Sequence, residues 1–248
     1  MPLSPEAHVR TAELVAAAAF NNAAWCDAVC RAHGRPGEFS DTFWLNRAEV
    51  PPFYPNVVTL MPQEALEQAN VISRLTVPGH WAVKDSFATL ELPSRGFTEL
   101  FSAQWIHLTT PPLAPASGAR WERVHDASGL AAWEAAWRAA RDPTSEGPAH
   151  AVFLPALLQD ERIAILAAFL QGSIVAGGIA YQAAGVISVS NTFFLNRAPQ
   201  GLRVELLAQT VAAFPGLPVV GYEHGDELST WCALGFEAMG PLRVWRKE

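Results

Sequence analysis

Cysteine is scarce in this sequence. The 248 residues include only Cys26, Cys30 and Cys232, an odd and sparse set that predicts no disulfide framework. Cys26, Cys30 and His33 recur at helical spacing, so they share one face of a helix, and three such side chains suit zinc. The sequence offers no fourth ligand nearby, and cysteine is among the most often buried residue types. A buried helix stripe is therefore the favoured interpretation, with a metal site as the alternative.

Charge is also low and carries no basic excess. Charged residues make up 17% of the chain, with 17 Lys and Arg against 24 Asp and Glu and a net charge of −7. Such a chain lacks the electrostatic footprint for nucleic acid or for an anionic membrane surface. We expect neither kind of partner.

Long apolar runs are missing as well. The longest uninterrupted stretches, 14–20 and 163–170, fall far short of the roughly 20 residues that span a bilayer. The first residues lack the basic start and the small-residue cleavage site of a signal peptide. We therefore expect a cytoplasmic protein without a membrane partner.

The motifs of several common enzyme classes are absent. The sequence contains no HExxH, no P-loop, no GxSxG, no CxxC pair and no intact GxGxxG. Zinc-protease, P-loop nucleotide, serine-hydrolase and nicotinamide chemistry therefore have no support in the sequence.

What the sequence does contain is a large apolar fraction and one clear break. Hydrophobic residues make up 50% of the chain, and its length allows one large domain or two small ones. Residues 109–118 are Pro, Ser, Thr, Gly, Ala and Leu, which neither complete a sheet ladder nor hold a helix. We predict two domains, 1–112 and 119–248, joined by a linker at 113–118.

Apolar periodicity predicts the elements on both sides of this break. In the first half we expect helices at 6–31 and 62–73, and strands at 38–46, 56–60, 80–83 and 102–108. In the second half we expect strands at 121–125, 163–170, 173–181, 185–194, 218–223 and 237–246, and helices at 130–141, 153–158, 200–214 and 227–234. The short joints at 171–172 and 183–185 make the three central strands an antiparallel meander. The pattern indicates an α/β (α+β) fold, a mixed sheet flanked by helices.

Two short motifs of the first half recur in the second half. Gly96-Phe97 precedes a strand in the first half, and Gly235-Phe236 precedes the last strand 139 positions later. Pro78-Gly79 and Pro215-Gly216 likewise precede apolar strands, 137 positions apart. These nearly equal offsets favour tandem copies of one fold.

The second half, about residues 119–248, resembles the GNAT superfamily of acyl-CoA-dependent N-acyltransferases. Residues 234–240 resemble that family's Gly-Phe after a helix, followed by its last hairpin. Residues 200–207 resemble its pyrophosphate loop, because Leu206 and Leu207 stand five and six positions after Gly201. The first half would be a degenerate copy of the same fold.

The resemblance implies a cofactor site for acetyl-CoA or a longer acyl-CoA as co-substrate. Main-chain groups of Phe193 and Leu195 would bind the pantetheine arm, and the pyrophosphate would bind at the loop formed by Gln200, Gly201, Leu202 and Arg203. Helix-start N–H groups next to a glycine are suited to a diphosphate in any protein. An ordinary strand-to-helix loop remains the alternative.

Two positions depart from the family pattern at this loop. Ala198 stands where Gln or Arg is usual, and Arg203 stands where a second Gly or Ala is usual. The Arg203 guanidinium either binds the phosphates directly or fills their site. The second interpretation predicts a catalytically inactive ligand-binding or scaffold protein.

Amine acylation needs a base for the ammonium nucleophile and an acid for the leaving thiolate. Glu223, at the end of a parallel strand, is the candidate base, with His224 as the second choice because its ordinary pKa suits the role. The alternative interpretation is that Glu223 and His224 are solvated loop residues. Trp231 occupies the position of the family's usual tyrosine acid, yet an indole N–H cannot release a proton. Its neighbour Cys232 we assign to the core.

The acceptor implied by the resemblance is an amine of a small molecule or a peptide. The aromatic, proline-rich segment 43–54 suits either an acceptor pocket between the two halves or the core between them, and we favour the core. The sequence does not predict the oligomeric state.

Overall fold

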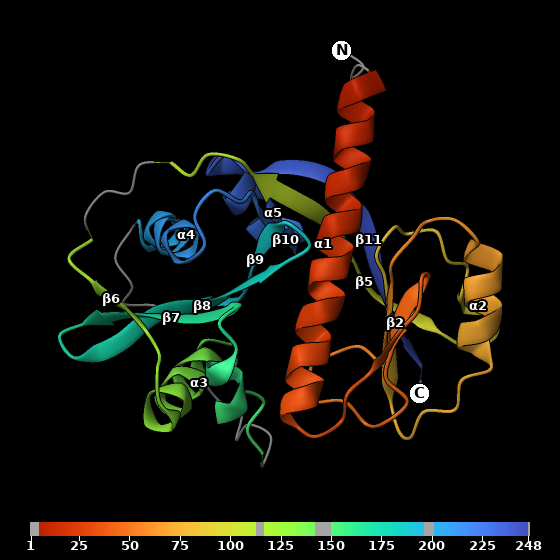
Figure 1. The fold of residues 1–248 in the computed structure, drawn as a ribbon, viewed down its shortest axis with the longest axis horizontal. Coiled ribbons are helices and arrows are strands. Elements are labelled where there is room, and N and C mark those ends of the chain that lie inside the picture. Colours follow the sequence, from red (N-terminus) through yellow and green to blue (C-terminus); the bar gives the residue numbers. More distant parts are fainter. Residues whose placement is uncertain (1–4, 113–116, 142–149, 196–200, 248) are drawn as a thin grey trace. The chain divides into compact units, whose positions relative to one another are not determined.

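A computed structural model of the protein describes residues 5–112, 117–141, 150–195 and 201–247 (Figure 1). The chain forms two compact units: Met1–His107 with Tyr222–Glu248, and Leu108–Gly221. The C-terminal segment thus packs with the N-terminal half, although the sequence predicted two consecutive domains. The prediction of tandem copies is about the common origin of the two halves of the sequence. The packing of the chain does not test it, so it stays a prediction.

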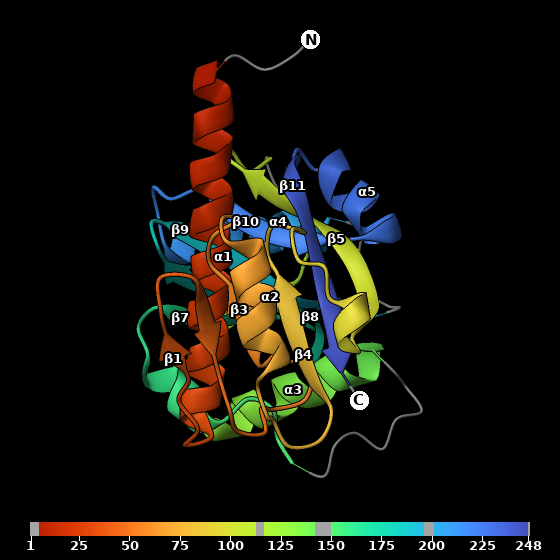
Figure 2. The same cartoon turned by 90° about the vertical axis from the view of Figure 1, so that its right-hand side faces the viewer.

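The described part of the first unit contains a mixed sheet in the order β1-β2-β3-β4-β11-β5. β11 lies between β4 and β5 and runs antiparallel to both (Figure 2). The elements are α1 (Pro5–Ala32), β1 (Glu38–Phe39), β2 (Phe43–Leu45), β3 (Val57–Thr59), α2 (Ala65–Ser73), β4 (Trp81–Asp85), η1 (Pro93–Arg95), β5 (Thr98–Leu108), α5 (Gly225–Ala233) and β11 (Glu237–Lys247).

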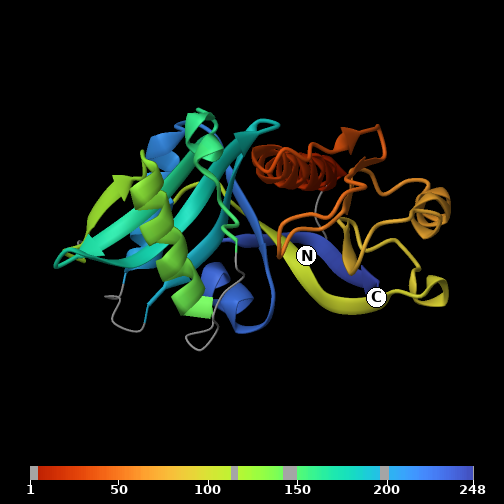
Figure 3. The ribbon, with the colours of Figure 1, turned by 90° about the horizontal axis from the view of Figure 1, so that it is seen from below.

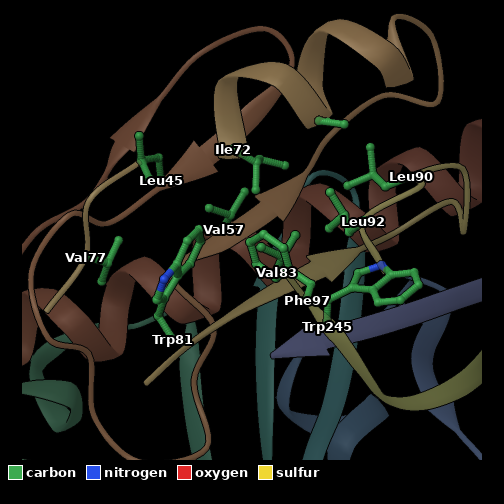
Figure 4. Packing of buried hydrophobic residues seen from close by; sticks show 11 residues of the cluster. Leu45, Val57, Ile72, Val77, Trp81, Val83, Leu90, Leu92, Phe97 and Trp245 are labelled. Carbon is green, nitrogen blue, oxygen red and sulfur yellow. The ribbon is translucent and has the colours of Figure 1, made fainter. Parts of the chain in front are cut away.

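Helices α1 and α2 cover opposite faces of this sheet, because neighbouring residues of a strand point to opposite sides. Lys84 of β4 donates from Nζ to Asn22 Oδ1 of α1 at 2.9 Å. Val83, the preceding residue, belongs to the buried cluster that includes Ile72 of α2. Figure 4 shows this cluster, with the Trp81 ring near Val57 and Val77.

Buried residues of the aromatic segment 43–54 lie in the core of the first unit, whereas the sequence favoured a core between the two halves. Trp44 is fully buried and donates from Nε1 to Asp27 Oδ1 of α1 at 3.0 Å. Tyr54 is 9% exposed, whereas Phe53 is 64% exposed. The expected single strand over 38–46 is wrong, because a turn separates β1 from β2. The Ser40 hydroxyl accepts from the Phe43 N–H in that turn.

The described part of the second unit contains a sheet in the order β10-β9-β8-β7-β6. Strands β6 to β9 are antiparallel neighbours, and β10 runs parallel to β9. The elements are β6 (Arg120–Arg123), α3 (Ala127–Arg141), η2 (Pro155–Gln159), β7 (Ile163–Leu170), β8 (Ser173–Ala183), β9 (Val186–Phe194), α4 (Leu202–Ala213) and β10 (Val219–Glu223), whose last two residues pack with the first unit.

The predicted meander is confirmed as β7, β8 and β9. Both joints are two-residue turns with positive φ at each residue: 51° and 82° at Gln171 and Gly172, and 52° and 74° at Ala184 and Gly185. Paired positive φ values are typical of the tight hairpin turns that match strand twist. The short joints therefore set the antiparallel order.

Helices α3 and α4 cover opposite faces of the second sheet, and α3 crosses its strands (Figures 1 and 3). A Cβ atom on Gly177 would lie 2.5 Å from Trp133 Nε1 of α3, whereas one on Gly178 would lie 3.0 Å from Leu206 Cδ2 of α4. These adjacent glycines let both helices approach the middle strand closely. Among the residues described, none of the helices has the length and apolarity needed to cross a bilayer.

Candidate functional site

Strand β9 carries a bulge at Asn191, whose φ is 51°. The register against β8 shifts by one residue between the pairs Ile179–Ser190 and Gly177–Phe193. One extra residue in a strand reverses which backbone groups face each side from that point on. The bulge therefore sets the orientation of the end of β9.

The hydrogen bonds on either side of the bulge follow this reversal. Before it, the Ile187 N–H donates to Pro218 O on the β10 side, at 3.0 Å. After it, the Leu195 N–H donates to Val175 O on the β8 side, at 2.9 Å. Alternation then turns the N–H and C=O groups of Thr192 and Phe194 toward the other edge.

This edge of β9 extends past its ladder with β10. Among the described residues, β10 pairs with β9 at Val219–Ile187 and Val220–Ser188, while β9 continues to Phe194. Uninterrupted alternation from Ile187 would put the main-chain groups of Phe193 and Leu195 on this edge. The bulge puts those of Thr192 and Phe194 there instead. Phe193 is 3% exposed, and its ring lies edge-on to Trp133 with centroids 5.4 Å apart.

Helix α4 begins at Leu202, directly after Gly201, which has a φ of 93°. The first helical bond runs from the Glu205 N–H to Gly201 O at 3.0 Å, so the N–H groups of residues 202–204 have no carbonyl partner inside the helix. Leu202 is 1% exposed and belongs to a core cluster with Ala176, so only its backbone is suited to ligand binding. Gln200 and Ala198 lie outside the described residues.

The Arg203 side chain lies against the end of β9. Its guanidinium carbon is 4.3 Å from the centroid of the Phe194 ring. The N–H groups of a guanidinium point outward in the plane of the group. When its face packs on an aromatic ring, these N–H groups remain available to phosphate oxygens. This contact brings the first turn of α4 next to the open edge of β9.

Glu205 holds the start of α4 and was missed by sequence reasoning. The side chain is nearly buried, with 8% of the residue exposed. Its carboxylate accepts from the Ser117 N–H, from Ser117 Oγ at 2.7 Å and from Trp121 Nε1 at 2.8 Å. An acidic residue in the first helical turn was visible in the sequence, but its partners lie more than 80 positions away.

Glu223 and His224 lie at the end of β10, in the part that packs with the first unit. Glu223 is half-buried. His224 is exposed, caps α5 in an extended conformation, and stacks on Phe101 with ring centroids 5.1 Å apart. Both are accessible side chains of an ordered strand end.

Tyr222 precedes them and is held by two contacts within the first unit. Its ring lies edge-on to Trp105 at a centroid distance of 5.5 Å. The buried Lys84 ammonium lies 4.1 Å from the Tyr222 centroid, within the range of a cation–π interaction. Tyr222 directly precedes the candidate base Glu223 in β10.

Trp231 is a core residue rather than a surface group. It is 1% exposed, and its ring lies edge-on to Phe236 at 5.4 Å. A side chain so deeply buried does not touch a substrate, which removes it as a catalytic residue. The expectation for its neighbour was also wrong: Cys232 is exposed, because successive helix residues point about 100° apart.

The buried-stripe interpretation of Cys26 and Cys30 is confirmed. Both thiols are buried, and desolvation raises the pKa of Cys26 to about 11 and that of Cys30 to about 12. The thiolate that zinc requires is therefore disfavoured at both. No group of three or more His, Cys, Asp or Glu suited to a metal ion occurs among the described residues.

Comparison by sequence finds no matching family profile and no matching curated protein. Comparison by structure finds many similar chains. A GCN5-related N-acetyltransferase from Kribbella flavida is 16% identical over 92% of this chain and 95% of its own, with a TM-score of 0.58. A second, from Sphaerobacter thermophilus, is 12% identical over 77% of this chain and 71% of its own, with a TM-score of 0.53.

A conserved protein of unknown function from Staphylococcus epidermidis is also similar. It is 11% identical over 85% of this chain and 92% of its own, with a TM-score of 0.55. At such identities a likeness establishes the fold and leaves the activity open. The chain has the fold of the GCN5-related N-acetyltransferase (GNAT) superfamily.

Proposed function

We propose that this protein transfers an acetyl or longer acyl group from acyl-CoA to an amine of a small molecule or a peptide. The observation that carries the proposal is the pairing, within the second unit, of an open β9 edge with the start of α4. The Arg203–Phe194 contact joins the two.

The cofactor would bind in two parts. The amide groups of the pantetheine arm would add to β9 as a further strand does, using the main-chain groups of Thr192 and Phe194. The diphosphate would accept hydrogen bonds from the N–H groups at 202–204 and from the Arg203 guanidinium. The anionic ligand also suits the positive end of the α4 dipole.

The reaction requires proton transfer at two atoms. Glu223 would take a proton from the ammonium so that the amine nitrogen attacks the thioester carbonyl, and His224 is the second candidate for this role. After the attack the nitrogen releases its second proton to water, the C–S bond breaks, and the thiolate of CoA takes a proton from an acid. Tyr222 is the acid candidate, since Trp231 is buried and its N–H does not ionise.

Calorimetric titration with CoA tests the cofactor part. We expect binding at micromolar to millimolar concentration, weakened about tenfold or more in Arg203→Ala, as for loss of a charge-assisted hydrogen bond of about 1.5–3 kcal/mol. Arg74→Ala, at an exposed arginine at the end of α2, is the matched control. If Arg203 instead fills the site, as in an inactive scaffold, Arg203→Ala will bind CoA more tightly.

Turnover of acetyl-CoA over a panel of amines tests the chemistry. Glu223→Gln should lower kcat and abolish the acidic limb of the pH profile, where the base becomes protonated, while leaving CoA affinity unchanged, because the carboxylate acts on the acceptor amine. Tyr222→Phe should slow thiolate release. Unchanged turnover in both variants would contradict these roles.

A further inference from the structure

The first unit contains a pocket of about 670 Å³. One wall is a face of α1, another is the segment 60–63 after β3, and the rest comes from Phe87 and residues 239–241 of β11. Ligand pockets in proteins commonly measure about 300–1,000 Å³ and are mostly apolar. The size and lining of this pocket match a small-molecule site.

Small residues and a bulge create the hollow. Ala12 and Ala16 lie one helical turn apart on α1, and neither fills the space in front of it. On β11, Ala238 pairs with Ile106 and Gly240 pairs with Trp105, so Met239 is the extra residue of a bulge. A bulge re-aims its strand, and here the bulged residues 239–241 line the pocket.

The walls are fixed by hydrogen bonds from buried polar groups. Gln68 is 1% exposed, and its Nε2 donates to Met61 O at 3.0 Å and to Gln63 O at 2.8 Å. The buried Thr59 hydroxyl accepts from the Ser86 N–H at 2.8 Å, next to Phe87. A pocket whose walls are fixed in advance binds a ligand without first ordering its own loops.

The lining carries a single charge. Glu13 is the one charged side chain among the described lining residues, it is exposed, and no cation of the described chain forms an ion pair with it. A carboxylate beside an apolar surface attracts a cation and repels an anion. The ligand chemistry that fits is an apolar body with a positively charged group at one end.

We propose that this pocket binds a small amphipathic amine, with its hydrocarbon body between α1 and the segment 60–63 and its ammonium group at Glu13. The site lies within the first unit alone. It does not depend on CoA binding or on acyl transfer, so either proposal stands if the other fails.

Calorimetric titration with n-hexylamine at pH 7 tests the proposal, with hexanoate as a ligand of equal chain length and opposite charge. We expect hexylamine to bind with a Kd in the millimolar range or below, and hexanoate to bind at least about fourfold more weakly, since repulsion replaces attraction at Glu13. No hexylamine binding up to about 10 mM, or equal binding of hexanoate, overturns the proposal.

Two pairs of variants locate the site. Glu13→Gln should weaken hexylamine binding about two- to fivefold, the usual value of an exposed ion pair. Glu67→Gln, at an exposed carboxylate of α2, should leave this binding unchanged.

Gly240→Leu should fill the pocket and weaken hexylamine binding more than tenfold. Gly240→Ala, whose Cβ would lie 3.8 Å from Val15 Cγ2 in ordinary contact, should still bind. Equal affinity in all four variants places any bound amine elsewhere and overturns the assignment.

Discussion

The Glu205 side chain ties the start of α4 to β6 and to the residues just before it. Its carboxylate accepts three hydrogen bonds from Ser117 and Trp121, and only 8% of the residue is exposed. A buried carboxylate in this setting is well satisfied, so its removal leaves donors without an acceptor. The carboxylate therefore holds the helix start together with the buried Leu202 side chain.

Glu205→Ala should lower the free energy of unfolding by about 1–3 kcal/mol, because it leaves partly buried donors unsatisfied. Urea unfolding followed by tryptophan fluorescence measures this. Glu67→Ala, at an exposed site on α2, should change stability by less than about 0.5 kcal/mol. Equal effects in both variants would show that the carboxylate contacts contribute nothing to the fold.

The three cysteines should differ in reactivity. Burial raises the pKa of the Cys26 and Cys30 thiols to about 11 and about 12, so the reactive thiolate stays scarce until the pH approaches those values. Cys232 is exposed. In the native protein at pH 8, iodoacetamide should modify Cys232 alone, and in denaturant all three, as read by mass spectrometry. Rapid native modification of Cys26 would contradict the burial.

Sequence patterns predicted most of the second unit at the scale of elements, because hairpins and amphipathic helices are specified by neighbouring residues. The end of β9 is the exception. Asn191 lies in a strand of mixed apolar and polar residues, and its bulge is a shift in register against β8 that local alternation does not predict. The main-chain groups on the open edge of β9 therefore belong to 192 and 194, one position from the expected 193 and 195.

The close approach of α3 and α4 to β8 can be tested by substituting the two adjacent glycines of β8. Gly177→Ala places a Cβ 2.5 Å from Trp133 Nε1 and 2.7 Å from the Leu166 carbonyl oxygen, and should cost about 1–3 kcal/mol through overpacking. Gly178→Ala meets the end of the flexible Leu206 side chain at 3.0 Å and Thr192 Cγ2 at 3.4 Å, and should cost less. Thermal unfolding of both variants measures which substitution lowers stability more. A larger loss in Gly178→Ala than in Gly177→Ala would contradict the packing of α3 on β8.

At the scale of the molecule, the C-terminal strand completes the sheet of the first unit. β11 pairs with β4 on one side and β5 on the other, and Trp245 belongs to the core cluster beneath α2 (Figure 4). No local pattern predicts a strand that joins partners more than 130 positions earlier in the chain. The sequence therefore indicated two parts and a break near residue 109, and assigned the last segment to the other part.

Truncation before β11 tests this arrangement. A chain that ends at residue 236 removes the strand between β4 and β5, so buried side chains such as Trp105 and Trp81 lose neighbours and backbone partners. We expect loss of the near-ultraviolet circular dichroism of the buried tryptophans and a lower melting temperature. A truncated chain with an unchanged spectrum and melting temperature would show that the first unit folds without its central strand.

The central claim is that the open edge of β9 and the start of α4 form a CoA site. The most direct measurement is calorimetric titration of CoA into the wild-type protein and into Arg203→Ala, with Arg74→Ala as the control. The account predicts binding to the wild type and the control, and about tenfold or greater loss in Arg203→Ala. No binding to the wild type at millimolar CoA, or tighter binding after removal of Arg203, would contradict it.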